Sequence, residues 1–99
     1  MDAMTVLSTN LKHYNIPFDV IENIFGGAVL KYPSKENWKL SVAFHEHTYG
    51  YKENLLECMG LNYNHPSERG SDTLGHCSPI YVLTKILQYE HCKSKKGFE

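Results

Sequence analysis

The stretch that decides the fold is the C-terminal segment SPIYVLTKILQYEH, residues 78–91. Ser78 is a favourable N-cap residue, and Pro79 suits the first helical position because its missing N–H needs no partner there. The apolar residues that follow have helical spacing and form a stripe over about half of the circumference; they are Ile80, Val82, Leu83, Ile86, Leu87 and Tyr89. The residues predicted to face solvent are Tyr81, Lys85 and Gln88. We therefore expect a closing amphipathic helix, with a polar tail at 93–99 that frays.

Two runs of alternating residues precede this helix and predict an antiparallel hairpin. The inward-facing residues of the two runs are Ala28, Leu30 and Tyr32, and then Trp38, Leu40, Val42 and Phe44. The polar stretch PSKEN at 33–37 lies between the runs and is typical of a turn. An isolated hairpin is not stable in water, so we expect helices to cover its apolar face.

The N-terminal quarter predicts a bent pair of helices. One face of the first helix carries Met4, Leu7, Leu11 and Tyr14. Asn15 is suited to end this helix, and Pro17 is suited to open a second, short helix that runs to Ile24. The pair Gly26-Gly27 would end that second helix.

The middle of the chain predicts one more short helix and a long loop. Tyr51, Leu55 and Met59 share one helical face, and Gly60 follows where a helix C′ residue belongs. Residues 61–77 contain Pro66, two glycines and many polar residues, and form the longest region with no regular pattern. The predicted fold class is therefore α+β in a single domain, residues 1–99. Its order is an N-terminal helix or helical pair, an antiparallel hairpin or small sheet, a short helix, a long loop and a C-terminal helix.

Composition limits the classes of function. The chain has 99 residues, a net charge of −1 and a single arginine, Arg69, so binding to nucleic acid by neutralising phosphates is not expected. The N-terminus lacks the pattern of a signal peptide, and no run of apolar residues is long enough to cross a membrane. Three cysteines at irregular spacing argue against a disulfide framework and favour a reducing cytoplasm.

Histidine and cysteine are the candidate metal ligands. His45 and His47 are two residues apart, so on one strand both would point to the same face. Neither CxxC nor HxxxH spacing occurs, although structural zinc sites usually have such spacing. The favoured prediction is a chain without metal or other cofactor, and a zinc-dependent enzyme stays open as an alternative.

Cys77 is the candidate nucleophile, because it lies next to the start of the closing helix, where the helix dipole lowers a thiol pKa. His76 is adjacent, but no third orienting group is evident. Cys58 and Cys92 fall in predicted helices and are expected to be inert. The carboxylates have no diagnostic spacing. We therefore predict a non-enzymatic protein and keep a cysteine-dependent enzyme as an alternative.

Aromatic residues near turns are the candidate binding residues. Tyrosine offers a large contact area at small entropic cost, and is enriched at binding surfaces. The predicted surface combines the Thr48–Tyr51 turn with the Asn62–His76 loop. Its residues are Tyr49, Tyr51, Tyr63, His65, Arg69, Ser71 and His76. The same mixture would suit a pocket that stacks a base and holds a phosphate, whereas an ordinary hydrated loop is the alternative.

Residues 31–89 resemble a family of small uncharacterised proteins of tailed bacteriophages. The matching residues are Tyr32-Pro33, Ser41-Val42, His45, Thr48-Tyr49-Gly50 and Leu55-Leu56-Glu57, then Asp72, Gly75 and Val82. Gly75–Pro79 departs from the aromatic-leucine-threonine step of that family, and the N-terminal helices are not part of the pattern. The resemblance implies phage origin and architecture, and no activity.

From this origin we predict an accessory protein that binds and inhibits a host component of anti-phage defence in the bacterial cytoplasm. A host protein is the expected partner. The alternatives are an oligomeric sponge for a nucleotide signal, a small zinc- or cysteine-dependent enzyme, and a minor virion component.

Overall fold

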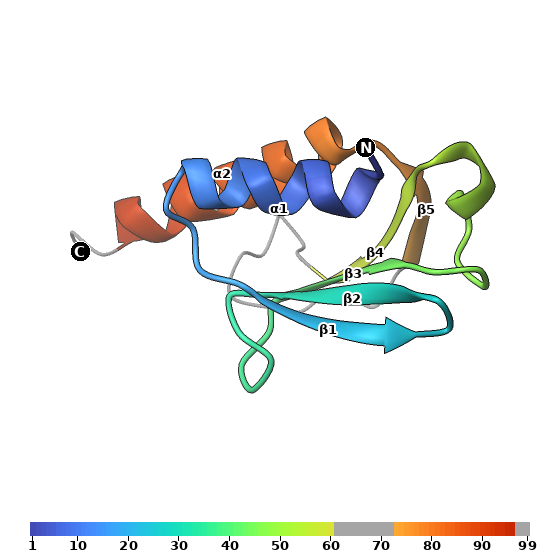
Figure 1. The fold of residues 1–99 in the computed structure, drawn as a ribbon. Coiled ribbons are helices and arrows are strands. Elements are labelled where there is room, and N and C mark those ends of the chain that lie inside the picture. The colour runs from blue at the N-terminus through green and yellow to red at the C-terminus, as the bar shows by residue number, and fades with distance from the viewer. Residues whose placement is uncertain (61–72, 97–99) are drawn as a thin grey trace.

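Two helices lie side by side on one face of a five-stranded antiparallel sheet (Figure 1). The computed structural model describes residues 1–60 and 73–96. The elements in chain order are α1 (Ala3–His13), β1 (Asp19–Ile24), β2 (Gly27–Tyr32), β3 (Leu40–Phe44), the 3-10 helix η1 (Tyr51–Glu53), β4 (Leu56–Gly60), β5 (Thr73–Cys77) and α2 (Pro79–Lys96). The strand order in the sheet is the chain order, β1-β2-β3-β4-β5. The predicted α+β class is confirmed, and the sheet is larger than a hairpin.

The core lies between the helices and the sheet. Strands β2 and β3 pair so that Leu30 faces Val42 and Tyr32 faces Leu40, and all four side chains are buried. The helices contribute buried residues to the same cluster, among them Leu7, Leu11, Val82 and Ile86. Burial of each such side chain is worth about 1.5–3 kcal/mol. The alternation at residues 28–32 and 40–44 therefore predicted the centre of the sheet correctly, whereas Trp38, predicted to face inward on the second strand, lies before the start of β3 and outside the core cluster.

Helix α1 confirms the first predicted helix, with one difference at its end. The side chain of Asp2 accepts a hydrogen bond from the backbone N of Thr5 at 2.8 Å and caps the helix. Tyr14, predicted on the apolar face, is the C-cap residue and is half exposed, because the helix ends at His13 before Tyr14 reaches the core.

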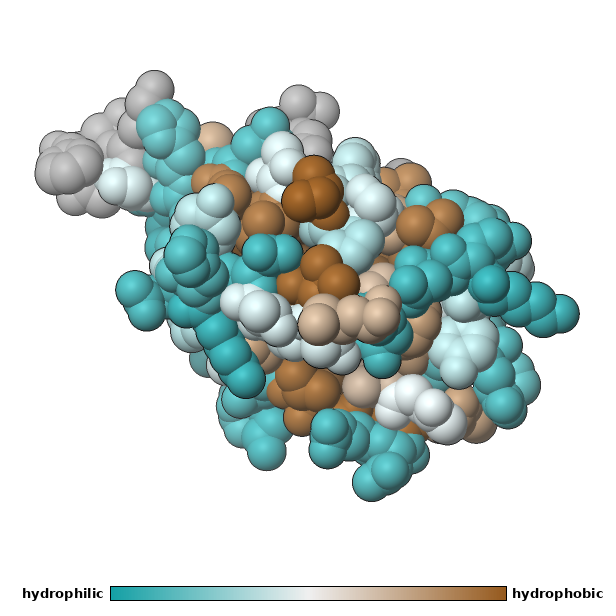
Figure 2. All heavy atoms as spheres, turned by 45° about the horizontal axis from the view of Figure 1, so that its top comes forward, coloured by the Kyte–Doolittle hydropathy of each residue, from teal (hydrophilic) through white to brown (hydrophobic). Residues whose placement is uncertain are grey.

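Helix α2 confirms the closing helix and continues to Lys96 rather than ending near His91. Ser78 Oγ accepts a hydrogen bond from the backbone N of Tyr81 at 3.1 Å, as the predicted cap should. Figure 2 brings the helical layer towards the viewer and shows apolar side chains in the middle of that face, with hydrophilic ones around them.

The predicted orientation of α2 was wrong at two positions. Ile80 is 63% exposed, whereas Lys85, expected in solvent, is only 6% exposed. The face that meets the sheet contains Val82, Lys85 and Ile86, with spacing i, i+3 and i+4. Ile80 lies well outside this face, about 160° from Val82 on a 100° wheel. The long aliphatic stem of Lys85 can pack there while its ammonium lies 5.3 Å from the centre of the Tyr81 ring.

The second predicted helix, from Pro17 to Ile24, was wrong, because this segment forms strand β1. Its residues pair with β2 in register, from Asp19 opposite Lys31 to Glu22 opposite Ala28. The β-branched Val20 and Ile21 suit a strand, and the free edge of β2 supplies hydrogen-bond partners that a local pattern cannot reveal. Phe25 and Gly26 form the hairpin turn and Gly27 begins β2, so the glycine pair does not end a helix.

The predicted helix Tyr51–Met59 was also wrong. Only the three-residue η1 forms, and Asn54, with a positive φ of 58°, ends it. Strand β4 follows and pairs with β3, so that Leu56 and Cys58 are buried while Glu57 and Met59 point the other way. Gly60 is therefore a strand end with a positive φ of 113°.

The region predicted to be irregular, 61–77, contains strand β5 at its C-terminal end. This strand pairs with β4, with Leu56 opposite Cys77 and Cys58 opposite Leu74. Residues 61–72 lie outside the described residues.

Candidate binding surface at one end of the sheet

Three chain reversals meet at one end of the sheet, because successive antiparallel strands alternate in direction. They are the β1–β2 turn, the β3–β4 connection and the junction between β5 and α2, all on the right in Figure 1. We call this region, residues 25–26, 45–55 and 76–78, the turn end. The connection between β4 and β5 leaves at Gly60, which pairs with the first residue of β3, and therefore starts at the opposite end.

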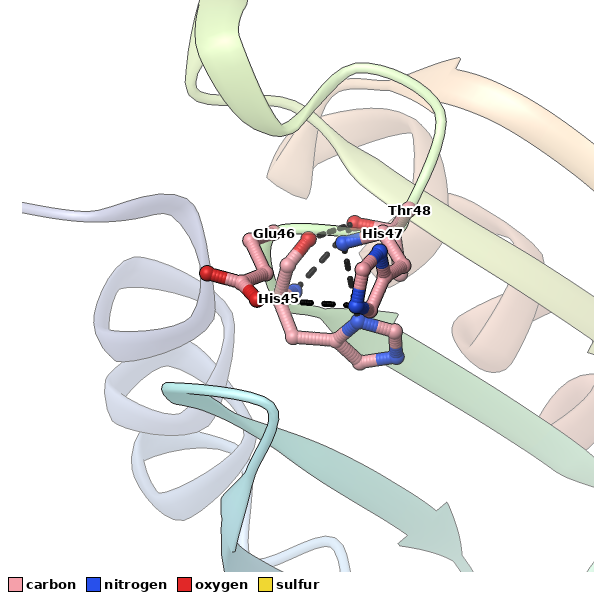
Figure 3. A network of polar contacts seen from close by, with 4 residues as sticks. All are labelled: His45, Glu46, His47 and Thr48. Carbon is pink, nitrogen blue, oxygen red and sulfur yellow. Dashed lines mark hydrogen bonds and ion pairs between the residues drawn. The ribbon is translucent and has the colours of Figure 1, made fainter.

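A short hydrogen-bond network fixes the turn after β3 (Figure 3). Thr48 Oγ1 donates to the carbonyl oxygen of His45 at 2.8 Å and accepts from the backbone N of His45 at 3.2 Å. The backbone N of Thr48 donates to the same carbonyl at 2.9 Å. Thr48 is itself buried, so these bonds stabilise the turn, and the neighbouring residues Glu46, His47 and Tyr49 are exposed.

An aromatic cluster surrounds this turn. The ring of Phe25, from the β1–β2 turn, lies 5.2 Å from that of His45 and 4.8 Å from that of His47. Phe25 is 60% exposed and has a positive φ of 46°, a conformation that is costly for a bulky residue. An exposed aromatic side chain is thus in contact with two imidazole rings.

The two candidate metal ligands lie in this turn and not on a strand, because β3 ends at Phe44. Their ring centres are 6.1 Å apart, and His45 Nδ1 accepts a hydrogen bond from the backbone N of His47 at 3.2 Å. His47 also lies 3.5 Å from the carboxylate of Glu46, an exposed pair of little energetic weight. Among the described residues, no group of three histidine, cysteine or acidic residues is placed to hold a metal ion.

Tyr49 is the second exposed aromatic residue at the turn end, with 70% of its surface accessible. Its backbone is held from both sides, since its N donates to Glu57 Oε2 at 2.8 Å and its carbonyl accepts from the backbone N of His76 at 3.1 Å. A Cβ at position 75 would lie only 2.5 Å from Tyr49 Cβ, so Gly75 makes room for it. The structure therefore brings two of the predicted binding residues, Tyr49 and His76, together.

A hollow lies beside Tyr49, between β5 and the first turn of α2. It has a volume of about 350 Å³ and is lined by Leu74, Gly75, His76, Cys77, Ser78 and Tyr81. Leu74 and Tyr81 are both partly exposed at its walls. The hollow extends the exposed aromatic surface of the turn end onto the edge strand.

The other predicted binding residues are placed differently or lie outside the described residues. Tyr51 is half-buried, with its ring 4.8 Å from Phe44, and lines a groove of about 620 Å³ between α1 and the β1–β2 hairpin. The predicted residues outside the described ranges are Tyr63, His65, Arg69 and Ser71. Phe25 was not predicted as a binding residue, because the segment before it was predicted to be a helix. The available signal for an exposed turn was an aromatic residue beside two glycines.

The candidate nucleophile Cys77 is the last residue of β5 and is buried. Its Sγ lies 3.6 Å from Cys58 Sγ, and 3.5 Å and 3.6 Å from the carbonyl oxygens of Leu74 and Gly75. Cys58 was wrongly placed on a helix and is a buried strand residue. Burial, followed by the neighbouring thiol of Cys77, raises the pKa of Cys58 to about 12. Cys77 therefore contacts another buried thiol, and this arrangement is unlike the cysteine–histidine pair of a catalytic site.

Comparisons of the chain with protein-family models, with curated protein sequences and with solved structures give no match. No helix within residues 1–60 and 73–96 is long and apolar enough to cross a membrane.

Proposed function

We propose that this chain is a small phage-encoded accessory protein that binds and inhibits a host protein of an anti-phage defence system. It acts in the bacterial cytoplasm and without chemistry of its own. The observation that carries the proposal is the pair of exposed aromatic side chains, Phe25 and Tyr49, held on hydrogen-bonded turns at one end of the sheet. The phage origin comes from the resemblance of residues 31–89 to small phage proteins.

Exposed aromatic residues on a rigid backbone are what a protein–protein interface needs. Aromatic anchors near the centre of an interface contribute a large share of the binding energy. Ordering flexible segments on binding costs free energy, so turns already held by Thr48 and by the Tyr49 backbone reduce that cost. The hollow beside Tyr49 could accept an apolar side chain of the partner, with Leu74 and Tyr81 as its walls.

A nucleotide sponge is the second candidate, and one observation favours it. The groove between α1 and the β1–β2 hairpin combines aromatic residues, Phe18, Phe44 and Tyr51, with hydroxyl groups and one cation, Lys12. Such a groove could stack a base and contact a phosphate. The carboxylates of Asp2 and Glu22 also line it and would repel a phosphate, so the protein-binding function is preferred.

The test is affinity capture from a lysate of the bacterium whose phage carries the gene. The bait proteins are the wild type, a Phe25→Ala/Tyr49→Ala variant, and Tyr14→Ala as the matched control. Tyr14 is a similarly exposed tyrosine at the far end of α1. We expect the wild type and the control to capture one host protein, and the double variant to lose at least about tenfold of it.

Mass spectrometry of both proteins and small molecules completes the test. Equal capture by the double variant and the control would show that the turn end is not the binding surface. Release of a nucleotide on denaturing the purified chain, without a captured protein, would favour the sponge. A circular dichroism spectrum of each variant verifies that it is folded.

A further inference from the structure

Two cysteines that are 19 positions apart in the sequence meet in the core. Cys58 is in β4 and Cys77 is in β5, and their sulfur atoms are 3.6 Å apart. The pairing shifts between them: Leu56 lies opposite Cys77 and Cys58 lies opposite Leu74, so β5 uses one more residue than β4 over this stretch. This bulge gives the two side chains a diagonal contact on the same face of the sheet.

We propose that Cys58 and Cys77 form a reversible disulfide when the chain meets a low-molecular-weight disulfide such as oxidised glutathione. The geometry requires a small change, because the sulfur atoms are already in contact and a bond between them needs an approach of roughly 1.5 Å. The strands that carry them are neighbours and antiparallel, so side-chain rotation can supply most of this approach. The inference is independent of the proposed binding function.

Cys77 is the thiol that meets the reagent first. It lines the hollow between β5 and α2, whereas Cys58 does not line it. Although both residues are buried, the hollow brings solvent and a small molecule to the Cys77 side of the pair. The raised pKa of Cys58, caused first by burial, keeps that thiol protonated near neutral pH, and it is therefore a poor nucleophile toward a reagent from solvent.

The reaction proceeds by thiol–disulfide exchange. The Cys77 thiolate attacks one sulfur of the reagent RSSR and forms a mixed disulfide, and one RS⁻ leaves. Cys58 Sγ then attacks Cys77 Sγ and the second RS⁻ leaves. The two protons of the protein thiols pass through solvent to the two leaving thiolates. In total the two cysteines lose two electrons, and one RSSR is reduced to two RSH.

The bond would join β4 and β5 covalently beside the hollow. It would close a loop that includes the connection between these strands, which restricts the unfolded chain. We expect the oxidised protein to melt at a temperature higher by about 10 °C, and the increase to disappear on reduction with dithiothreitol.

The test uses the full chain, folded, in oxidised glutathione at pH 8, followed by tryptic mapping. Cleavage after Lys52, Arg69 and Lys85 places the two cysteines in separate peptides, 53–69 and 70–85. We expect these two peptides to be linked, and Cys92, which is partly exposed, to stay outside this link and to carry at most a glutathione of its own. The Cys92→Ser variant is the matched control and should give the same linked peptides.

The Cys58→Ala variant tests the order of the two steps. It should stop at the mixed disulfide, and peptide 70–85 should carry one glutathione. The proposal is overturned if the folded wild type gives glutathione adducts on separate peptides without the link, or only dimers through Cys92. Because the linked peptides are sought in the wild type, this outcome is decisive even if the Cys58→Ala variant does not fold.

Discussion

The hydroxyl of Tyr32 joins a buried side chain of β2 to helix α2, and its removal gives a sharp prediction. Tyr32 is fully buried, its ring lies 6.0 Å from that of Tyr89 at a right angle, and its hydroxyl donates to the carboxylate of Glu90. Tyr32→Phe removes one oxygen atom and keeps the shape of the ring. The change therefore isolates the hydrogen bond between β2 and α2.

The expected loss follows from the charge and exposure of the acceptor. A hydrogen bond to a charged group contributes about 1.5–3 kcal/mol to the free energy of unfolding. Glu90 is 31% exposed and also lies 3.5 Å from Lys93, so its carboxylate remains solvated after the substitution. We therefore expect the lower part of that range, about 1.5–2 kcal/mol at pH 8. For a domain of about 100 residues this lowers Tm by roughly 6–15 °C.

The loss should depend on pH in a defined direction. Burial, and then the hydrogen bond and charge of Glu90, raise the pKa of Tyr32 above its ordinary value near 10. The folded protein then binds this proton more tightly than the unfolded chain does. The stabilisation is complete below about pH 10 and falls by about 1.4 kcal/mol per pH unit above it. The difference between wild type and Tyr32→Phe should therefore shrink by about 1.4 kcal/mol between pH 8 and pH 11.

Urea unfolding, followed by circular dichroism and by the fluorescence of Trp38, measures both quantities. Tyr14→Phe is the control: it removes a hydroxyl from a half-exposed tyrosine and should change the free energy of unfolding by less than about 0.5 kcal/mol. Equal stability of Tyr32→Phe and wild type at pH 8 would refute the reasoning. A difference that stays constant up to pH 11 would refute the part that concerns the tyrosine proton.

Four further substitutions test other parts of the fold by the same unfolding assay. Leu30→Ala removes a fully buried side chain at the centre of the sheet and should cost about 3–5 kcal/mol; a loss under 1 kcal/mol would mean that the core is packed differently. Gly60→Ala should cost more than about 3 kcal/mol, because its Cβ would lie 2.2 Å from the Lys39 carbonyl oxygen at a positive φ. Gly26→Ala also has a positive φ but meets nothing within 4 Å, so it should cost only about 1 kcal/mol, and equal losses at both glycines would contradict the clash. Ser78→Ala should cost about 1 kcal/mol by uncapping α2, and no loss would show that its hydrogen bond to Tyr81 contributes nothing.

Local patterns were sufficient where the partners are near in sequence. Helix α1 and the start of α2 follow from apolar spacing and from Ser78, because helical hydrogen bonds and caps join residues within one or two turns. The β2–β3 hairpin follows from alternation, since its partners are separated by one short loop. Lys85 shows where local patterns are insufficient: the helical wheel of α2 placed this residue in solvent, although it is buried.

Patterns failed where a strand depends on a distant neighbour. Residues 17–24 and 51–59 each contain apolar residues compatible with a helix, but most of the first segment forms β1 beside β2, and the end of the second forms β4 beside β3. A short segment takes the conformation for which neighbouring backbone groups are available. The predicted binding residues were affected in the same way: Tyr49 and His76 meet at the turn end, whereas Tyr51 turns toward Phe44.

The sequence by itself determined the α+β class, both helices and the central hairpin, because short-range spacing and helix capping act within a few residues. Only the tertiary structure decided that the sheet has five strands, that the ring of Phe25 contacts those of His45 and His47, and that Cys58 meets Cys77. These contacts join residues 19 or more positions apart. They form because antiparallel pairing places different chain reversals at the same end of the sheet, and places side chains of neighbouring strands on the same face of it. The spacing of residues within one segment does not encode such contacts.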